Sequence, residues 1–468
     1  MRVSNLISFG IEAIIFALVI VVFLLIVWGI GYKLIYQKIM GGKEKLCIKQ
    51  IIPKALLSVV ILVILFATLL SGRMGGGIVL EPFSAYKQAW YFFNLSEWRN
   101  IILNICMFIP FGFILPFAIK QFKTPWKTYL AGLLFSLGIE SVQLILKRGV
   151  FETDDLINNL LGTMIGYGFF LVVMLIIKKK PFISVIGYQI PLVVVVAVFS
   201  AIFYSYNTKE LGNLECENTS SFNMPDVILG DDIKLSKGAT TANIYKEKIA
   251  SLDETHKYAE QIFALQDKKI DENRVDEYDD TVIYHSEDDS LNLWVEFKGM
   301  TASYSDFDQS FGDNEDECEY LIGADEETVR DALKKTGFEI PEKAVFSSVE
   351  DSYFFEIKSE KGKDEYSTGT ATCRINDKGK VVNVEYNIVS CEPYKTVDII
   401  SAEEAYELLC KGEFYYNDHT IERDMPYTVK DVRLTYRTDT KGFYRPVYEF
   451  VLVNDECEGE IHIDILGY

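Results

Sequence analysis

Residues 100–168 read NIILNICMFIPFGFILPFAIKQFKTPWKTYLAGLLFSLGIESVQLILKRGVFETDDLINNLLGTMIGYG, and this stretch decides the fold of the chain. It holds three apolar segments with the length of membrane spans. These segments also carry the polar residues Asn104, Glu140, Gln143, Asp155 and Asn159. Because ionisable and amide groups are costly inside a membrane, each of them is a candidate for function or for helix pairing. The stretch predicts a helical membrane bundle with a polar interior.

The second and third segments repeat one helical spacing. Polar and small residues recur at offsets 0, 4, 7 and 11, first as Ser136, Glu140, Gln143 and Lys147, then as Asp155, Asn159, Gly162 and Gly166. These offsets place each set on one face of a helix. The short connection makes the two helices antiparallel neighbours, and glycine lets backbones approach closely. We predict a polar seam formed by Asn104, Glu140, Gln143, Arg148, Asp155 and Asn159, with Gly112, Gly162 and Gly166 at helix contacts.

Hydropathy and charge divide the chain into two parts. Six apolar runs of spanning length occupy residues 8–30, 51–70, 101–119, 126–146, 156–177 and 182–204. Residues 1–206 hold 18 Lys+Arg against 8 Asp+Glu, which leaves 28 against 59 for the rest. We therefore expect an all-α membrane bundle of about six transmembrane helices over residues 1–206. A linker over 207–240 and an acidic extracytoplasmic α+β domain over 241–468 should follow.

Lysine-rich loops set the expected orientation. They follow the first, third and fifth apolar runs, so all three lie on one side of the membrane, and that side is cytoplasmic by the positive-inside rule. The chain is then a multi-pass protein of a bacterial cell membrane with its C-terminal domain outside. The seam residues converge near the outer leaflet, and Arg148 lies above them. We interpret Gly75-Gly76-Gly77 as a flexible turn in an outer loop.

The central motifs also carry a family resemblance. Asn104 with Phe108-x-Pro110-x-Gly112, Ile139-Glu140-x-x-Gln143, and Arg148 before Asp154-Asp155-x-x-x-Asn159-x-x-Gly162-x-x-x-Gly166 stand in a characteristic order. This pattern, over residues ~50–180, resembles the VanZ-like family of bacterial membrane proteins. The resemblance implies a link to glycopeptide resistance, because the family's namesake is associated with lowered susceptibility to teicoplanin. It implies no reaction.

The tail shows alternating helix and strand signals. Helices are expected at 244–266, at 325–336 before Gly337, and from the capping box Ser401-Ala402-Glu403-Glu404 to Cys410. Strands are expected at 291–297, 344–346, 353–357, 369–375, 381–389, 431–436, 446–453 and 459–465. The two stretches at 325–338 and 402–414 suggest two similar subdomains. The last ~70 residues are similar to exported modules of the YycH/YycI and PepSY types, which implies a regulatory module that binds an envelope protein.

Cysteines and acidic residues limit the chemistry of the tail. Among its six cysteines we predict that Cys373 and Cys391 pair, because they flank a proposed hairpin turn; reduced, buried thiols are the alternative. No CxxC, His-Cys or HExxH spacing is present, so neither a metal nor a cofactor is expected. The acidic excess argues against nucleic acid as a partner.

Three functions fit these observations. In the first, a protein without catalytic activity uses the seam to bind a membrane lipid, a cell-wall precursor or a glycopeptide antibiotic. In the second, a membrane enzyme acts on a lipid-linked substrate, with Glu140 as acid/base, Asp155 as orienting group and Arg148 as phosphate clamp. In the third, the tail senses the state of the envelope. The absence of a nucleophile or metal motif favours the first.

Overall fold

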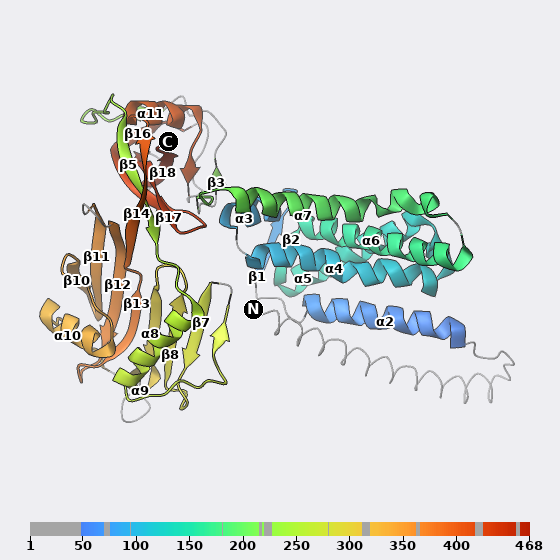
Figure 1. Cartoon of the computed structure of the whole chain (residues 1–468), viewed down its shortest axis with the longest axis horizontal. Helices are drawn as coiled ribbons and strands as arrows, with labels where there is room; N and C mark the ends of the chain where they lie inside the picture. Colours follow the sequence, from blue (N-terminus) through green and yellow to red (C-terminus); the bar gives the residue numbers. More distant parts are fainter. Residues whose placement is uncertain are drawn as a thin grey trace. The chain divides into compact units, whose positions relative to one another are not determined.

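The chain folds into two compact units, Met1–Glu210 and Leu211–Tyr468 (Figure 1). The computed structural model describes residues 48–69, 75–93, 95–179, 181–214, 218–219, 227–278, 280–310, 319–361, 366–416, 425–454 and 459–468. The division falls within a few residues of the change in charge and hydropathy. Each unit has its own hydrophobic core.

Five helices in the described part of the first unit are long and apolar enough to cross a membrane, so the protein is a multi-pass membrane protein. They are α2 (Ile48–Leu69), α4 (Leu95–Ala118), α5 (Pro125–Leu146), α6 (Thr153–Lys178) and α7 (Ile190–Thr208), the last extended by η3 (Phe182–Gln189). The short η2 (Lys120–Lys123) joins α4 to α5. The span expected at residues 8–30 lies outside the described residues.

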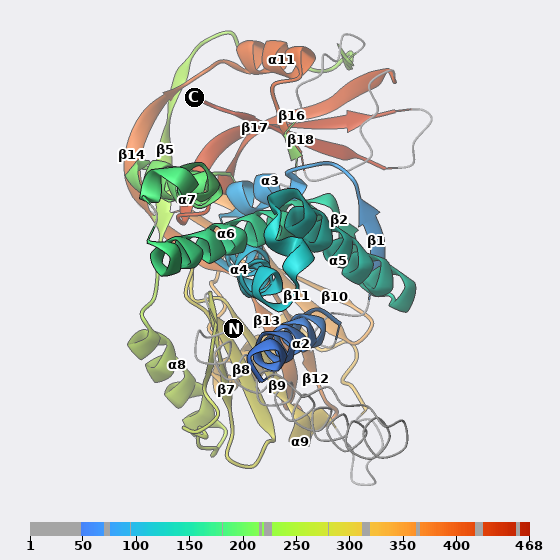
Figure 2. The same cartoon turned by 90° about the vertical axis from the view of Figure 1, so that its right-hand side faces the viewer.

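Helix α6 lies against both α4 and α5 (Figures 1 and 2). Glycine makes the close approach of α4 and α6 feasible. A Cβ atom added at Gly162 would lie 2.0 Å from the carbonyl oxygen of Ile105. One added at Gly166 would lie 2.0 Å from the carbonyl oxygen of Ile109. At Gly112 it would lie 2.1 Å from the Thr163 carbonyl oxygen. All three glycines therefore lie at the helix contact where the sequence places them.

A small cap joins the ends of these helices. It consists of β1 (Gly75–Val79), α3 (Ser84–Phe92) and β2 (Arg148–Glu152), and β1 pairs with β2 in parallel. The interpretation of Gly75-Gly76-Gly77 as a flexible turn is therefore wrong, and the short connection between α5 and α6 is itself a strand. The glycine run suggests a turn because glycine tolerates many conformations. A strand pair, however, is held through main-chain groups that glycine also has.

The second unit is a 16-stranded sheet with helices packed on it. In path order the strands are β3-β15-β18-β17-β5-β14-β12-β13-β9-β8-β7-β6, with β10, β11, β16 and β4 off this path. Their bounds are β3 (Asn218–Thr219), β4 (Val227–Leu229), β5 (Thr240–Glu247), β6 (Asp276–Glu277), β7 (Thr281–His285), β8 (Leu291–Glu296), β9 (Ala302–Asp306), β10 (Val345–Val349), β11 (Ser352–Lys361), β12 (Tyr366–Ile375), β13 (Val381–Tyr386), β14 (Val389–Ile399), β15 (Tyr415–Tyr416), β16 (Tyr427–Thr438), β17 (Phe443–Val453) and β18 (Ile461–Leu466).

Two separate cores lie under the helices of this unit. Helices α8 (Leu252–Leu265) and α10 (Glu326–Thr336) contribute to one core, and α11 (Ala402–Lys411) contributes to the other. A single turn, α9 (Phe307–Ser310), follows β9. The expected membrane bundle followed by an α+β domain is confirmed in outline.

Two expectations for the tail need correction. Residues 244–247 belong to β5 rather than to a helix, because α8 starts only after its N-cap Ser251. The proposed linker is partly built into the domain: β4 pairs with β16, and Gly212 N donates to Asp439 Oδ2 at 2.7 Å.

The predicted disulfide between Cys373 and Cys391 is also wrong. Cys373 lies opposite Val384 on β13, whereas Cys391 lies opposite Tyr366 at the far end of β12. Seven positions along a strand correspond to about 23 Å, far beyond the reach of a disulfide. The two side chains belong to different core clusters. Cys216, Cys318 and Cys457 lie outside the described residues.

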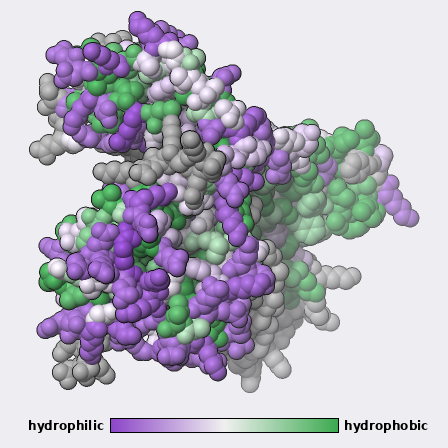
Figure 3. Space-filling model, turned by 60° about the vertical axis from the view of Figure 1, so that its left-hand side comes forward, coloured by the Kyte–Doolittle hydropathy of each residue, from purple (hydrophilic) through white to green (hydrophobic). Residues whose placement is uncertain are grey.

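Hydropathy distinguishes the surfaces of the two units. Figure 3 shows mostly hydrophilic side chains over the C-terminal unit and apolar ones over the helices. Ile145, Ile176 and Val193 are 77%, 67% and 62% exposed on α5, α6 and α7. Such exposure of large apolar side chains is expected for helices that face lipid.

Candidate functional site

The seam residues lie near one end of the bundle, around α6. Glu140 is six residues before the end of α5, and Asn159 is six residues after the start of α6, so each lies about 9 Å along its helix. Both side chains are almost completely buried, at 2% and 3% exposed. The cap of β1, α3 and β2 adjoins this end, since β2 connects α5 directly to α6. The site is therefore enclosed.

Two hydrogen bonds made by seam residues join α6 to its neighbours. Asn104 Nδ2 on α4 donates to Asp155 Oδ1. Asn159 Nδ2 donates to Ser136 Oγ on α5 at 2.9 Å. These bonds satisfy amide and carboxylate groups that would otherwise be costly in hydrocarbon. They connect α4, α5 and α6 through side chains as well as through packing.

Gln143 and Arg148 contact α2 and not the seam between α5 and α6. Gln143 Nε2 donates to Thr68 O at 3.0 Å, and Arg148 Nη1 donates to Leu69 O at 3.3 Å. Both acceptors are carbonyls in the last turn of α2, which a helix leaves without an internal partner. Arg148 reaches them because β2 pairs with β1 just beyond α2. Two of the six seam residues therefore cap α2 rather than line the α5–α6 contact.

The sequence reasoning did not assign a role to Asp154, which lies beside the seam. Its side chain is 1% exposed and accepts from Phe83 N at 2.5 Å and from Ala85 N at 2.8 Å. Asp154 thus satisfies the first N–H groups of α3 from another helix. The Asp154-Asp155 pair was visible in the motif, but its partner in α3 was not.

Tyr86 and Asn158 form a second link between α3 and α6. Tyr86 Oη donates to Asn158 Oδ1 at 2.5 Å, and Asn158 is 1% exposed. Burial, reinforced by the nearby carboxyl groups of Asp154 and Asp155, raises the pKa of the Tyr86 phenol to about 12. The phenol therefore remains a hydrogen-bond donor at physiological pH.

Two side-chain oxygens of the seam differ from the other polar atoms there in their hydrogen bonding. Glu140 Oε2 and Asn159 Oδ1 are buried and have no hydrogen-bond partner among the described residues. The Glu140 carboxyl group faces the backbone of Glu152 and the carboxyl group of Asp155. A buried polar atom without a partner costs about 1–3 kcal/mol. Two such atoms in one enclosed region indicate a place where a group with hydrogen-bond donors could bind.

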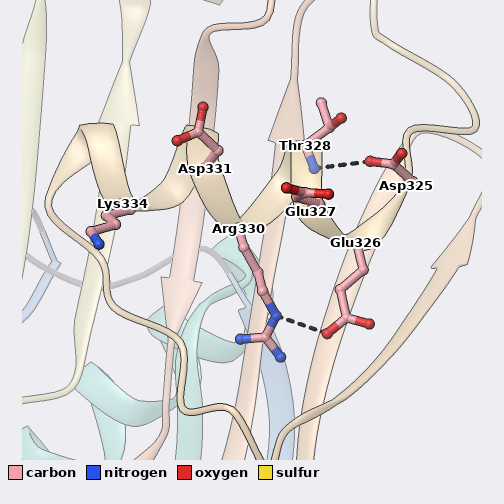
Figure 4. Close-up of a pocket in the computed structure, with 7 residues that line it drawn as sticks. All are labelled: Asp325, Glu326, Glu327, Thr328, Arg330, Asp331 and Lys334. Atoms are coloured by element: carbon pink, nitrogen blue, oxygen red, sulfur yellow. Dashed lines mark hydrogen bonds and ion pairs between the residues drawn. The ribbon is translucent and has the colours of Figure 1, made fainter.

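One surface hollow of the second unit is lined by residues of α10 and its N-cap alone (Figure 4). Asp325 there accepts from Thr328 N at 2.9 Å, as a helix N-cap does. Arg330 pairs with Glu326 at 2.7 Å and donates to the carbonyls of Ile340 and Ala344. These contacts stabilise the end of α10 and provide no site for chemistry. Within the described ranges, no group of three His, Cys, Asp or Glu residues could hold a metal ion.

Comparison with known proteins gives a family match within the first unit. Residues 51–176 match the family model described as VanZ/LLP1. Among solved structures, the Bacillus megaterium YpeB C-terminal domain has 13% sequence identity and a TM-score of 0.21, over 47% of this chain and 94% of that chain. None of the curated proteins matches this chain. Residues 51–176, which contain every seam residue, are therefore the part of the chain that is similar to the VanZ/LLP1 family.

Proposed function

We propose that this membrane protein acts in the bacterial cell envelope. Its polar seam binds the polar group of a lipid, a cell-wall precursor or a glycopeptide, and this binding lowers susceptibility to teicoplanin-type antibiotics. The family match supports the link to glycopeptide resistance. The C-terminal unit lies outside the cell in this proposal, in agreement with the lysine-rich loops.

The proposal rests on Glu140 Oε2, which is buried and has no hydrogen-bond partner among the described residues. Most other seam groups are occupied within the protein: Asp155 by Asn104, and the amide nitrogen of Asn159 by Ser136. Glu140 Oε2 and Asn159 Oδ1 are side-chain oxygens without a partner among the described residues, and a bound group with hydrogen-bond donors would satisfy both. Hydroxyl, amide and ammonium groups of a sugar or peptide fit this requirement. A role in packing alone would leave Glu140 without a reason to be ionisable.

The direct test is binding of teicoplanin to the full chain in lipid nanodiscs. Glu140→Gln replaces one carboxylate oxygen by an NH2 group, so it removes an acceptor while the size of the side chain is kept. A hydrogen bond contributes about 0.5–1.5 kcal/mol net, so the variant should bind up to about tenfold more weakly. In cells, protection by the intact chain should disappear with the same substitution.

Ser141→Ala is the matched control. Ser141 is adjacent to Glu140 on α5, but its hydroxyl donates only to Leu137 O of its own helix. This variant should bind and protect like the unchanged chain at equal membrane levels. Full protection by Glu140→Gln, or equal loss of folded protein and of protection, would assign the seam to helix packing instead.

The enzymatic alternative has less support. It requires Arg148 to clamp a phosphate, whereas Arg148 donates to the last turn of α2. It also requires two carboxyl groups to cooperate, whereas Asp155 is held by Asn104. Accumulation of a cleaved lipid-linked product in membranes with the intact chain, but not with Glu140→Gln, would favour this alternative.

A further inference from the structure

A second hollow in the C-terminal unit has the character of a binding site. Its volume is about 640 Å³, within the ~300–1,000 Å³ typical of small-ligand sites. We call it the β12–β16 hollow. Its lining comes from β11, β12, β16 and β17, and consists of Glu356, Ile357, Thr368, Gly369, Thr370, Arg433, Leu434, Thr435, Arg437 and Glu449. Strands distant in the sequence thus converge on one space.

One wall carries two arginines held by a buried carboxylate. Glu449 has a side chain only 5% exposed and is the cross-strand partner of Arg433. Arg433 Nε donates to Glu449 Oε2, and Arg437 Nη2 donates to Glu449 Oε1 at 2.6 Å. Arg437 Nε also donates to Asp464 Oδ2 at 2.7 Å. Guanidinium groups fixed in this way lose little freedom on binding a ligand.

Both arginines keep donors available to the hollow. Within the described residues, Arg433 uses only its Nε atom and Arg437 leaves Nη1 without a partner. Their side chains are 57% and 37% exposed, so the remaining N–H groups are accessible. Arg433 and Arg437 are four positions apart on β16 and share one face of the strand. Together they offer the donors that a carboxylate accepts in pairs.

The opposite wall is polar and carries a negative charge. Thr368 and Thr370 alternate on β12 and share a face, and Glu356 on β11 is the cross-strand partner of Thr370. Among the described residues, no side-chain hydrogen bond involves Glu356, Thr368 or Thr370. Among the residues that line the hollow, charges balance, because Arg433 and Arg437 are matched by Glu449 and Glu356. A dianion would disturb this balance, whereas a zwitterion preserves it.

We propose that the β12–β16 hollow binds a short peptide with free termini. Its C-terminal carboxylate lies against Arg433 and Arg437, its ammonium group lies near Glu356, and the threonine hydroxyls contact its amide groups. This site is independent of the seam and of the function proposed for it.

The test uses the full chain in nanodiscs and tri-alanine as the probe, followed by calorimetry. Tri-alanine should bind, and its C-terminal amide should bind at least tenfold more weakly, because the amide lacks the charge that Arg433 recognises. N-acetylated tri-alanine should also lose affinity. Arg433→Gln should weaken tri-alanine binding at least tenfold, since Arg437 and His462 still contact Glu449 and preserve the local fold.

Arg374→Gln is the control. Arg374 is 43% exposed on β12, pairs with Asp351 and does not line the hollow. This variant should bind tri-alanine unchanged. Should Arg433→Gln fail to fold, Glu356→Gln on the opposite wall provides the same test at the ammonium end. Absence of tri-alanine binding, equal binding of the amide, or tighter binding of inorganic phosphate would overturn the proposal.

Discussion

Single glycines determine how closely the membrane helices pack. At Gly166, the position of a Cβ atom is already occupied by the carbonyl oxygen of Ile109 on the neighbouring helix. Backbone cannot move aside as a flexible side chain can, so even a methyl group has no room. At Gly138, on α5, no atom of the other described helices lies within 4 Å of the equivalent position. The two glycines look alike in sequence, but they differ in what surrounds them.

This difference gives a prediction for two alanine variants. Gly166→Ala should destabilise the bundle by about 1–3 kcal/mol, as overpacking does, because α4 and α6 must separate. Gly138→Ala should leave stability unchanged or raise it slightly, because alanine favours helix more than glycine. The midpoint of unfolding of each full-length variant in detergent measures both effects. Similar midpoints for the two variants would argue against the close helix contact.

Elements with complete local signals could be predicted well from the sequence. Helix α11 has the expected capping box and is followed by Gly412 as a left-handed C-cap, and α10 ends just before Gly337 as expected. The start of α8 was misplaced, although Ser251 and Glu254 form the same kind of capping box, because apolar residues continue from the preceding strand. The pairing of β1 with β2 had no local signal at all, since the two strands are far apart in sequence.

The same limit applies to the candidate site. The sequence spacing places Glu140 on one face of its helix and Asn159 on one face of the next. Both side chains are buried, on adjoining helices. The partners of Gln143 and Arg148 are main-chain carbonyls of α2. Every residue has such a carbonyl, so no sequence pattern identifies the one that is contacted. Residue types therefore indicate where polar groups lie, while the tertiary fold decides what they bind.

A prediction for α3 follows from its contacts with α6. Asp154→Ala removes the acceptor for Phe83 N and Ala85 N and should cost about 1–2 kcal/mol, as the loss of an N-cap does. Asp154→Asn keeps one acceptor and should have a smaller effect. Limited proteolysis between β1 and α4 provides the measurement, because a loosened α3 is cut faster. The bundle itself should remain inserted, and equal protection of all three proteins would contradict the capping role.

The whole molecule consists of two units that differ in composition and in core. We predict that residues 211–468 fold as a separate soluble fragment, and that the first 210 residues insert into membranes without them. A fragment of residues 240–468 should melt at a lower temperature. It lacks β4 and the Gly212 N–H group that contacts the fully buried Asp439.

Circular dichroism melting of the two fragments distinguishes these cases. The longer one should show a single cooperative transition, and the shorter one a transition lowered by several degrees. Identical melting temperatures would show that residues 211–239 do not contribute to the stability of the domain, as expected of the linker that the sequence suggested.

The parallel pairing of β1 with β2 also restricts how the protein is made. Parallel strands need a long crossover between them, and here the crossover includes α4 and α5, which cross the membrane once in each direction. Strand β1 is synthesised well before β2, so it waits without its partner until both spans have been inserted. The pairing of β1 with β2 therefore forms late in the biogenesis of the protein. A chain stalled within α5 carries an unpaired strand beside an incomplete bundle, in a form that membrane quality control can recognise.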